Sequence, residues 1–440
     1  MYRDLTRGPI ARSLVLFALP MMAGNLLQQF YNIADTLIVG RALGTDALAA
    51  VGSAYTLMTF LTSILLGLSM GSGALFSIYR GRGDEVSLRS AIAHAFGLIL
   101  LLTLALNAAV YAFLNPILHF LRVPAAIWGG MREYLLVVFA GLVATSVYNY
   151  LACMLRALGN SAAPLVFLGV SALLNVGLDL LFVPVLGWGI AGAAWATVIA
   201  QYVSAAGMLV YVLAKCKILL PKRSELHLNR SILGEIFRLS SLTCAQQSVM
   251  NFGILMVQGL VNSFGATVMA AFAAAVKIDT FAYLPVQDFG NAYSTFAAQN
   301  FGAKREDRIR EGTRRAFLLS AGFGAALSIA VCALAAPLMR LFVEPGETAV
   351  VAAGVRYLRI EGALYAGIGC LFLFYGYFRA VQRPGVSVVL TAISLGTRVL
   401  LAYLLSAFWG EVGIWLSIPI GWVLADLAGL WFMKARPLRV

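Results

Sequence analysis

Two carboxylates lie inside long apolar stretches of the sequence, where a charged side chain is costly. Asp35 belongs to the run Arg12–Gly44, and Asp179 belongs to the run 163–184. At membrane depth a carboxylate costs at least about 2.5–3.5 kcal/mol on insertion scales, so each acid must face protein or water. A buried acid of this kind takes up a proton or a cation. These two acids are therefore the first candidates for a functional site.

Neutral oxygen-bearing side chains accompany the two acids at helical spacing. Asn175 and Asp179 are four residues apart and share one face of a helix, and Thr197 and Gln201 form a similar pair in the next apolar run. Carboxylate, amide and hydroxyl oxygens suit Na⁺ or a shared proton. We therefore predict a cation-coupling site for H⁺ or Na⁺ at Asp35, Asn175, Asp179 and Thr197. A purely structural contact between packed helices is the alternative, and no other cofactor is expected.

The run that carries Asp35 predicts a helix that is polar on one side and bendable. Pro20 removes one backbone hydrogen bond inside the run and favours a kink there. At about 100° per residue, six polar side chains fall within roughly a third of the circumference. They are Asn25, Gln28, Gln29, Asn32, Asp35 and Thr36. We predict a gating helix that bends at Pro20 and responds to a proton or a cation at Asp35.

The second half of the sequence has ionisable residues of its own within apolar runs. Lys277 and Asp288 lie on one polar stripe, three turns apart, so they line a cleft or pair with other helices. Glu361 and Arg398 form an expected structural ion pair, and Asp279 is a further deep acid. Met and Tyr side chains suit hydrophobic cargo because Met adapts to varied shapes, although at helical spacing most such residues are core or lipid-facing. The candidate substrate cleft comprises Gln28, Tyr31, Asn32, Gln201, Met250, Met256, Lys277, Asp288 and Arg398.

Composition places the chain in a bilayer. Of its 440 residues 61% are hydrophobic and 12% are charged, whereas a soluble protein carries about twice that charge. The net charge of +13 does not indicate nucleic-acid binding, because Lys and Arg lie in short connections between apolar runs. Five scattered cysteines suggest neither a metal site nor a redox pair. The three histidines belong to no HExxH pattern, and no Ser/His/Asp set is evident, so an enzyme is not expected.

Charged or Gly/Pro-rich connections divide the chain into about twelve membrane spans. We expect an all-α integral membrane protein with two pseudo-symmetric lobes of six helices, residues 1–214 and 232–440, joined by a cytoplasmic linker, 215–231. The first six spans are 13–41, 46–79, 88–114, 132–155, 163–184 and 190–214. The second six are 232–263, 267–298, 313–342, 352–378, 386–408 and 411–433. Most Lys and Arg residues fall on the side of both termini and the linker, which predicts that this side is cytoplasmic.

The two halves read as an internal repeat. A shift of 221 residues places Gly44 on Gly265, and a shift of 223 places Tyr134 on Tyr357. Because each half has an even number of spans, both enter the membrane in the same direction, and transporters with such parallel halves bind cargo between them and rock. The repeat also maps the first-half site onto the second half. Asp35, Asn175, Asp179 and Thr197 fall on Met256, Arg398, Ala402 and Gly421. We therefore predict ion binding in the first half alone.

Several short motifs occur in an order that resembles the multidrug and toxin extrusion (MATE) family over essentially the whole chain. They are Leu19-Pro20, Asp35, Gly44, Leu48-Ala49-Ala50-Val51-Gly52, Gly81-Arg82-Gly83-Asp84, Arg156-Ala157-Leu158-Gly159-Asn160, Asn175-x-x-x-Asp179, and Gly187-x-Gly189-Ile190-Ala191-Gly192-Ala193-Ala194-x-Ala196-Thr197. The resemblance implies twelve helices in two lobes and export driven by inward H⁺ or Na⁺ flow. It implies a first-lobe cation site at Asp35, Asn175, Asp179 and Thr197, with a bend near Pro20. Because span seven has no mid-membrane acid, the chain more closely resembles the DinF-like bacterial branch of the family.

These observations together predict an antiporter that exports amphipathic organic cations from a bacterium. It is expected in the cytoplasmic (inner) membrane with several spans, in contact with bilayer lipid and small cationic cargo, and to act as a monomer. The alternative is a lipid-linked oligosaccharide flippase of related two-lobed fold. Such a cavity would hold several Lys or Arg residues for a pyrophosphate, and Lys277 and Arg398 are the only deep cations.

Overall fold

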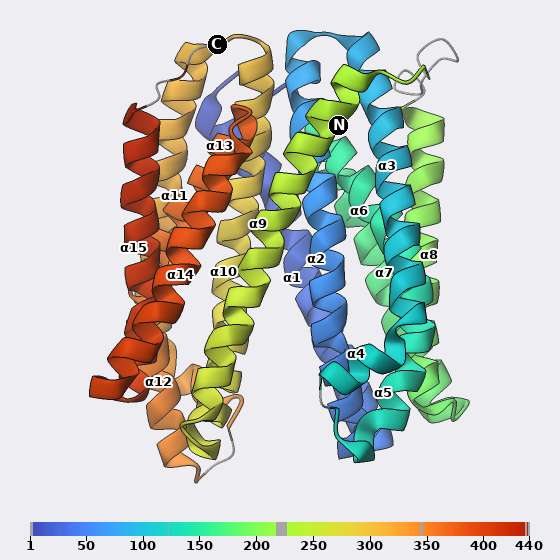
Figure 1. The fold of residues 1–440 in the computed structure, drawn as a ribbon, viewed down its shortest axis with the longest axis vertical. Helices are drawn as coiled ribbons and strands as arrows, with labels where there is room; N and C mark the ends of the chain where they lie inside the picture. The colour runs from blue at the N-terminus through green and yellow to red at the C-terminus, as the bar shows by residue number, and fades with distance from the viewer. Residues whose placement is uncertain (1–2, 122, 217–226, 344–345, 436–437, 439–440) are drawn as a thin grey trace. The chain divides into compact units, whose positions relative to one another are not determined.

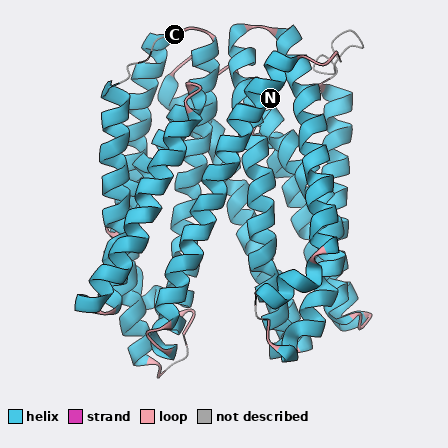
Figure 2. Cartoon of the chain, viewed as in Figure 1, coloured by secondary structure: helices cyan, strands magenta, loops and turns pink. Residues whose placement is uncertain are grey.

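A computed structural model describes the chain except for residues 1–2, 122, 217–226, 344–345, 436–437 and 439–440. Every regular element in the described part is a helix, and Figure 2 shows no strand among these residues. This follows from the composition, because hydrocarbon offers no partner to backbone N–H and C=O groups and a helix satisfies them within one segment. The predicted all-α fold class is confirmed.

The helices follow one another along the chain with short connections (Figure 1). The first half contains α1 (Ile10–Leu43), α2 (Thr45–Arg82), α3 (Glu85–Ala112), α4 (Leu114–Phe120), α5 (Ala125–Val138), η1 (Phe139–Gly141), α6 (Leu142–Ala157), α7 (Ala162–Leu180), η2 (Leu181–Val185) and α8 (Gly189–Lys215). The second half contains α9 (Arg230–Asn262), α10 (Ala266–Gly302), α11 (Glu306–Arg340), α12 (Thr348–Gly362), α13 (Tyr365–Ala380), α14 (Pro384–Trp409) and α15 (Glu411–Ala435).

The long helices match the expected membrane spans. Within the described residues, 10 helices are long and apolar enough to cross a bilayer, and α12 with α13 pass the same test together as a pair bent by 49°, which is a broken span or a re-entrant loop. The remaining long helix, α9, coincides with the expected span 232–263 but is less apolar, since it carries Gln246, Gln247 and Asn251. The chain is therefore a multi-span membrane protein, as predicted.

Two expected spans are interrupted in ways that their sequence pattern did not indicate. The expected span 132–155 consists of α5 and α6, joined by the 3₁₀ turn η1. The expected span 163–184 ends in a π-helical turn, η2, which contains Pro184 and begins two residues after Asp179. Single π-turns are frequent at functional sites, and this one ends the helix that carries two of the candidate ligands.

The chain forms two compact units, and each of two long helices is divided between them. Unit 1 contains Ala23–Cys244, and unit 2 contains Arg3–Met22 and Ala245–Val440. The divisions in α1 and α9 follow Met22 and Cys244, a difference of 244 − 22 = 222 residues, within the shifts that relate the two halves of the sequence. The expected lobes, 1–214 and 232–440, stay a prediction, and residues 217–226 of the expected linker lie outside the described residues.

Within unit 1, α2 packs very closely against the first part of α9. A Cβ atom on Gly67 would lie 2.6 Å from the Cα of Cys244, and one on Gly71 would lie 2.5 Å from the Cα of Ser240. The hydroxyls of Ser72 and Ser240 are 2.9 Å apart in the same contact. Small residues let helix backbones approach in a membrane, where packing rather than the hydrophobic effect drives helix association.

Within unit 2, the N-terminal arm is fastened to the end of α10 and the start of α11. Arg308 donates hydrogen bonds to the backbone carbonyls of Leu5, Arg7 and Gly8, at 3.2, 2.8 and 2.9 Å. The Leu5 amide donates to Gln299 at 3.2 Å, and the Leu5 side chain is fully buried. These bonds fix the start of α1 in unit 2 and leave its later part, beyond Met22, to position Asp35 in unit 1.

Candidate ion-coupling site

Three helices of unit 1 bring the four predicted ligands together. Asp35 lies on α1, Asn175 and Asp179 lie one turn apart on α7, and Thr197 lies on α8. The carboxyl groups of Asp35 and Asp179 are within hydrogen-bonding distance of each other. Asn175 Nδ2 donates to Thr197 Oγ1 at 3.4 Å, and Thr197 donates to the carbonyl of Ala193 at 3.1 Å.

The helices α1 and α7 approach each other through side chains near Gly24 and Leu168. A Cβ atom on Gly24 would lie 3.5 Å from the Leu168 side chain of α7, which is an ordinary van der Waals contact and marks where the two helices meet. Asp35 lies three turns further along α1, and Asp179 lies three turns beyond Leu168 on α7. The two acids therefore meet because their helices pair at one point and each carries its carboxylate the same distance from it.

The oxygens of this site lack donors. Asp179 is fully buried and Asn175 is 2% exposed. Within the described part of the chain no hydrogen-bond donor reaches either carboxylate oxygen of Asp179, Oδ1 of Asp35 or Oδ1 of Asn175. A buried acceptor without a donor costs about 1–3 kcal/mol, and two adjacent carboxylates repel each other. A proton or a monovalent cation among these oxygens would relieve both costs, so the residues present fit H⁺ or Na⁺.

A tyrosine completes the site and was not among the predicted residues. Tyr134, on α5, is 7% exposed, lies beside the Thr197 hydroxyl and is close to both Asp35 and Asp179. A signal for it exists in the sequence, because Tyr134 is one of the residues that the repeat matches to a tyrosine in the second half, Tyr357. A phenol next to two carboxylates can donate one hydrogen bond and can also provide an oxygen ligand.

The predicted cleft residues of unit 1 lie around this site in different ways. Gln28 is next to Tyr31, and Tyr31 is in turn close to Asp35. Asn32 Nδ2 donates to the hydroxyl of Tyr55 at 3.4 Å. Gln201 instead faces the break in the fourth span, where a Cβ atom on Gly141 would collide with its Oε1. The polar side chains of α1 thus surround Asp35, whereas Gln201 occupies a separate place.

The predicted cleft residues of unit 2 do not form one group in the described part of the chain. Tyr283 donates a hydrogen bond to the sulfur of Met250, at 3.6 Å. Met256 is 41% exposed, Lys277 is exposed, and Asp288 is only 2% exposed. Their role in cargo binding stays a prediction.

A second charged group, in unit 2, was only partly foreseen. Asp279 of α10, Glu361 of α12 and Arg398 of α14 are close enough to interact electrostatically. Tyr357 lies beside Glu361, and Tyr365 lies beside Asp279. The expected Glu361–Arg398 pair therefore belongs to a larger set, and in the described residues the guanidinium makes no direct ion pair with either acid. The sequence did not group Asp279 with Glu361 and Arg398, because Asp279 lies off the polar stripe and points about 200° away from Lys277 around the helix.

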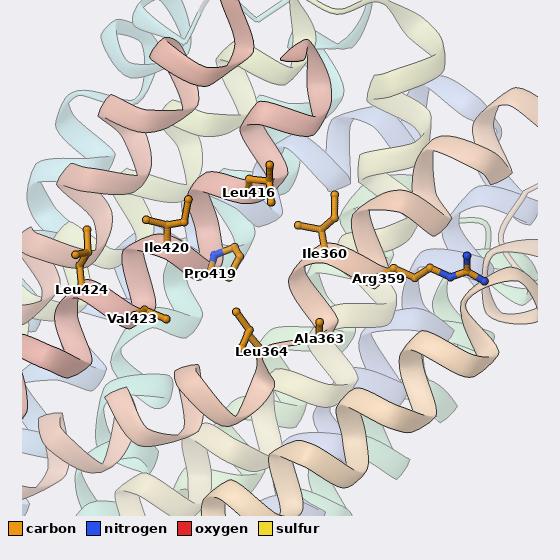
Figure 3. A pocket seen from close by; sticks show the side chains of 9 residues that line it. All are labelled: Arg359, Ile360, Ala363, Leu364, Leu416, Pro419, Ile420, Val423 and Leu424. Atoms are coloured by element: carbon orange, nitrogen blue, oxygen red, sulfur yellow. The ribbon is translucent and has the colours of Figure 1, made fainter. Parts of the chain in front are cut away.

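A cavity of about 350 Å³ lies on unit 2, and none of the candidate site residues lines it (Figure 3). It lies between α12 and α15, next to the bend between α12 and α13. Its lining is apolar apart from Arg359, whose guanidinium points away from the other side chains in Figure 3. No carboxylate lines it, so it offers no counter-charge to a cationic cargo.

The fold and the site together define a multi-span membrane protein in which the fully buried Asp179 adjoins the half-buried Asp35, an arrangement suited to a monovalent cation. The MatE family model matches residues 20–181 and 242–404. This chain therefore belongs to the MatE family, the multidrug and toxin extrusion family predicted from its motifs, and it is a transporter rather than an enzyme.

Relatives and a solved structure agree with this assignment. The probable multidrug resistance protein YpnP of Bacillus subtilis is 30% identical over 439 residues, which cover 98% of this chain and 96% of YpnP. The FAD transporter of Shewanella oneidensis is 23% identical over 432 residues, which cover 96% of this chain and 94% of that protein. An outward-facing multidrug resistance MATE family transporter of the MOP superfamily has the same fold, with a TM-score of 0.93 at 21% identity over 98% of this chain and 97% of the other.

Proposed function

We propose that this transporter is a secondary active efflux antiporter that exports amphipathic organic cations in exchange for H⁺ or Na⁺. The observation that carries the proposal is the pair of the half-buried Asp35 and the fully buried Asp179 of unit 1, since both oxygens of Asp179 and Oδ1 of Asp35 have no donor in the described residues. The name of YpnP supports a multidrug cargo, whereas that of the FAD transporter shows that relatives differ in what they carry. The carboxylates favour cationic cargo for this chain.

Coupling follows from competition for the same carboxylates. When the pair is open to the cytoplasm, its negative charge attracts a cationic cargo toward the site in unit 1. When the pair is open to the outside, a proton or Na⁺ binds between the carboxylates and removes the charge that held the cargo. With the repulsion gone the two helices that carry the acids, α1 and α7, can approach each other. Pro20 lacks a backbone N–H and gives α1 a point at which to bend.

Under this proposal Asn175 and Thr197 are ligands that set the selectivity of the site. The Asn175 amide already donates to Thr197, so its own carbonyl oxygen is turned away from that bond and is free to ligate. We further propose that the protein lies in the inner membrane of a bacterium with both termini in the cytoplasm, and that it acts as a monomer. Lys and Arg residues concentrated at both chain ends and in the linker support this orientation.

Efflux from proteoliposomes tests the proposal. A fluorescent organic cation is loaded, and a pH gradient and a Na⁺ gradient are imposed separately on the wild type, Asp35→Asn and Asp179→Asn. We expect efflux under one of the gradients and its loss in both variants. Asp426→Asn removes a half-buried acid of α15, outside the site, and should retain efflux. Gradient-driven efflux that persists in Asp35→Asn and Asp179→Asn would contradict the coupling scheme.

The flippase alternative receives no support from the charges in unit 2. Arg398 lies with two carboxylates, so its charge is already countered, and Lys277 is exposed on another face of α10. A pyrophosphate would need several uncompensated cations together. Loss of surface-polysaccharide synthesis on deletion of the gene, with no change in drug efflux, would favour the flippase.

A further inference from the structure

The charged group of unit 2 contains two residues that the repeat matches to residues at the ion site of unit 1, although its two acids lie on other helices of the repeat. The repeat shift of 223 residues places Asn175 on Arg398 and Tyr134 on Tyr357. In unit 1, Asn175 and Tyr134 lie at the Asp35–Asp179 pair. In unit 2, Arg398 and Tyr357 lie at Glu361 and Asp279. Two matched positions therefore contribute to a two-carboxylate group in each copy of the repeat.

A third matched position shows that a smaller residue in unit 2 accompanies the larger, charged side chain of Arg398. The shift of 224 residues places Thr197 on Gly421. In unit 1 the Thr197 hydroxyl contacts the Asn175 amide, at 3.4 Å. In unit 2 a Cβ atom on Gly421 would lie 3.5 Å from the Cβ of Arg398 and 2.5 Å from the carbonyl oxygen of Ser394. The glycine lets α15 pack directly on the base of the arginine, so the small residue accommodates the larger one.

The two groups also differ in charge, because Asn175 of unit 1 is replaced by Arg398 at the matched position of unit 2. In unit 1 the matched position is a neutral amide, and two carboxylates face each other with no cationic side chain nearby in the described residues. In unit 2 the two carboxylates have a guanidinium within electrostatic reach, and each also has a tyrosine neighbour. Glu361 is 4% exposed and one of its oxygens has no donor among the described residues, so its charge needs compensation from within the site.

We propose that Arg398 is a built-in counter-ion that takes the place of the exchangeable cation in the second copy of the site. Its guanidinium is attached to the chain and cannot be released, so Asp279 and Glu361 keep their compensation throughout transport. Exchange of H⁺ or Na⁺ is then confined to unit 1. This inference rests on the proposed coupling site, and it gives a physical reason why only one copy of the repeat is coupled.

Removal of the tethered charge should convert the second group into an ion site. The substitution Arg398→Asn installs the residue that unit 1 has at the matched position and leaves two buried carboxylates without a cation. An uncompensated buried charge is strongly unfavourable, so the site would take up a mobile cation instead. The shorter Asn side chain also vacates the space that the guanidinium fills, and a cation can bind there.

The test is equilibrium binding of ²²Na⁺ to purified protein at alkaline pH, in an Asp35→Asn, Asp179→Asn background that disables unit 1. We expect no saturable binding in this background and one saturable site per molecule after Arg398→Asn. Addition of Glu361→Gln should abolish the gained binding. Lys277→Asn, which removes a cation of the same unit away from the group, should gain no binding. The inference is overturned if Arg398→Asn gains no saturable ²²Na⁺ binding. It is also overturned if the background, with Arg398 intact, already shows binding that Glu361→Gln abolishes.

Two further measurements separate failure to fold from failure of the inference, and separate it from the proposed function. Arg398→Lys keeps the charge and should behave like the parent, which shows that the position tolerates substitution. If Arg398→Asn alone does not fold, Glu361→Gln with Arg398→Asn removes one of the two uncompensated charges and the repulsion between them, and should restore folding. Binding of ²²Na⁺ or uptake of H⁺ by the wild type, lost in Asp35→Asn, tests the proposed function independently of Arg398.

Discussion

Substitution of Asp179 by Asn should stabilise the folded protein in the absence of a coupling ion while it abolishes ion-coupled transport. Asp179 and Asp35 are within hydrogen-bonding distance, and both oxygens of Asp179 lack a donor in the described residues. Asn has nearly the same shape, carries no charge and supplies an Nδ2 donor that can reach the Asp35 carboxylate. The substitution thus removes the defect that the proposed ion would otherwise correct.

The size of the effect follows from the geometry. Two unit charges about 4 Å apart repel by about 4 kcal/mol at an effective dielectric constant near 20. A hydrogen bond to a charged group contributes a further net stabilisation of about 1.5–3 kcal/mol. Relaxation and partial protonation of the wild-type pair reduce the sum, so we expect about 1–4 kcal/mol of stabilisation at alkaline pH without Na⁺.

Thermal unfolding in detergent, followed at alkaline pH in choline and in sodium buffers, measures this effect. The wild type should be stabilised by the coupling ion, because a ligand that binds only the folded state raises its stability. Asp179→Asn should have a higher melting temperature than the wild type in choline and should show no response to Na⁺ or to acidification. Asp426→Asn is the matched control and should keep the wild-type response. A melting temperature of Asp179→Asn below that of the wild type in choline would refute the reasoning.

Three other changes have defined outcomes. Gly71→Ala forces a Cβ atom to within 2.5 Å of the α9 backbone and should destabilise the protein by about 1–3 kcal/mol in reversible unfolding, whereas Gly97→Ala, where no atom lies within 4 Å, should not. Asp84→Ala removes the cap of α3, where the Asp84 side chain accepts from the Ser87 amide at 3.0 Å, at a cost of about 1 kcal/mol. Because hydrogen bonds from the Ser87 hydroxyl and then from its amide lower the pKa of Asp84, the cap stabilises the fold at neutral pH. This stabilisation is lost as pH falls through the folded-state pKa, so wild type and variant should converge in acid unfolding. Pro20→Ala restores a backbone hydrogen bond of α1 and should slow efflux without weakening equilibrium binding of the coupling ion at Asp35; unchanged efflux would contradict a bend at Pro20.

The sequence was sufficient for features that depend on one helix and insufficient for those that depend on two. The apolar run 163–184 predicts α7, and a spacing of four residues puts Asn175 and Asp179 on one face of it. The expected convergence of Asp35 and Thr197 on that face relied on family resemblance, since no periodicity reveals which helices pair. Tyr134 was missed because its contact with Thr197 depends on the packing of α5 against α8.

Asp279 was recognised as a deep acid, but its grouping with Glu361 and Arg398 was missed for a related reason. The polar stripe of its helix passes through Lys277 and Asp288, and Asp279 lies off that stripe. It matters only because α12 and α14 bring Glu361 and Arg398 to it. The break η1 within the fourth span was equally hidden, since its sequence, Phe139–Gly141, is as apolar as its surroundings.

The two copies of the repeat differ at both features that ion coupling requires. The ion site needs a carboxylate pair without a fixed cation, which unit 1 has and which Arg398 removes from unit 2. The response needs a helix that can bend, and α1 has Pro20 two residues before it passes from unit 2 to unit 1. The repeat shifts of 221–224 place Pro20 on positions 241–244 of α9, which contain no proline, and α9 runs unbroken from Arg230 to Asn262. Because α1 also carries Asp35, one helix holds the ligand and the flexible point, and neither is duplicated in its counterpart. Under the proposed coupling a functional division between matched halves arises from few positions. Arg398→Asn should leave unit 2 a carboxylate pair without a fixed cation, and Ser241→Pro should give α9 a point at which to bend, but the acids of unit 2 would still lie on other helices, α10 and α12.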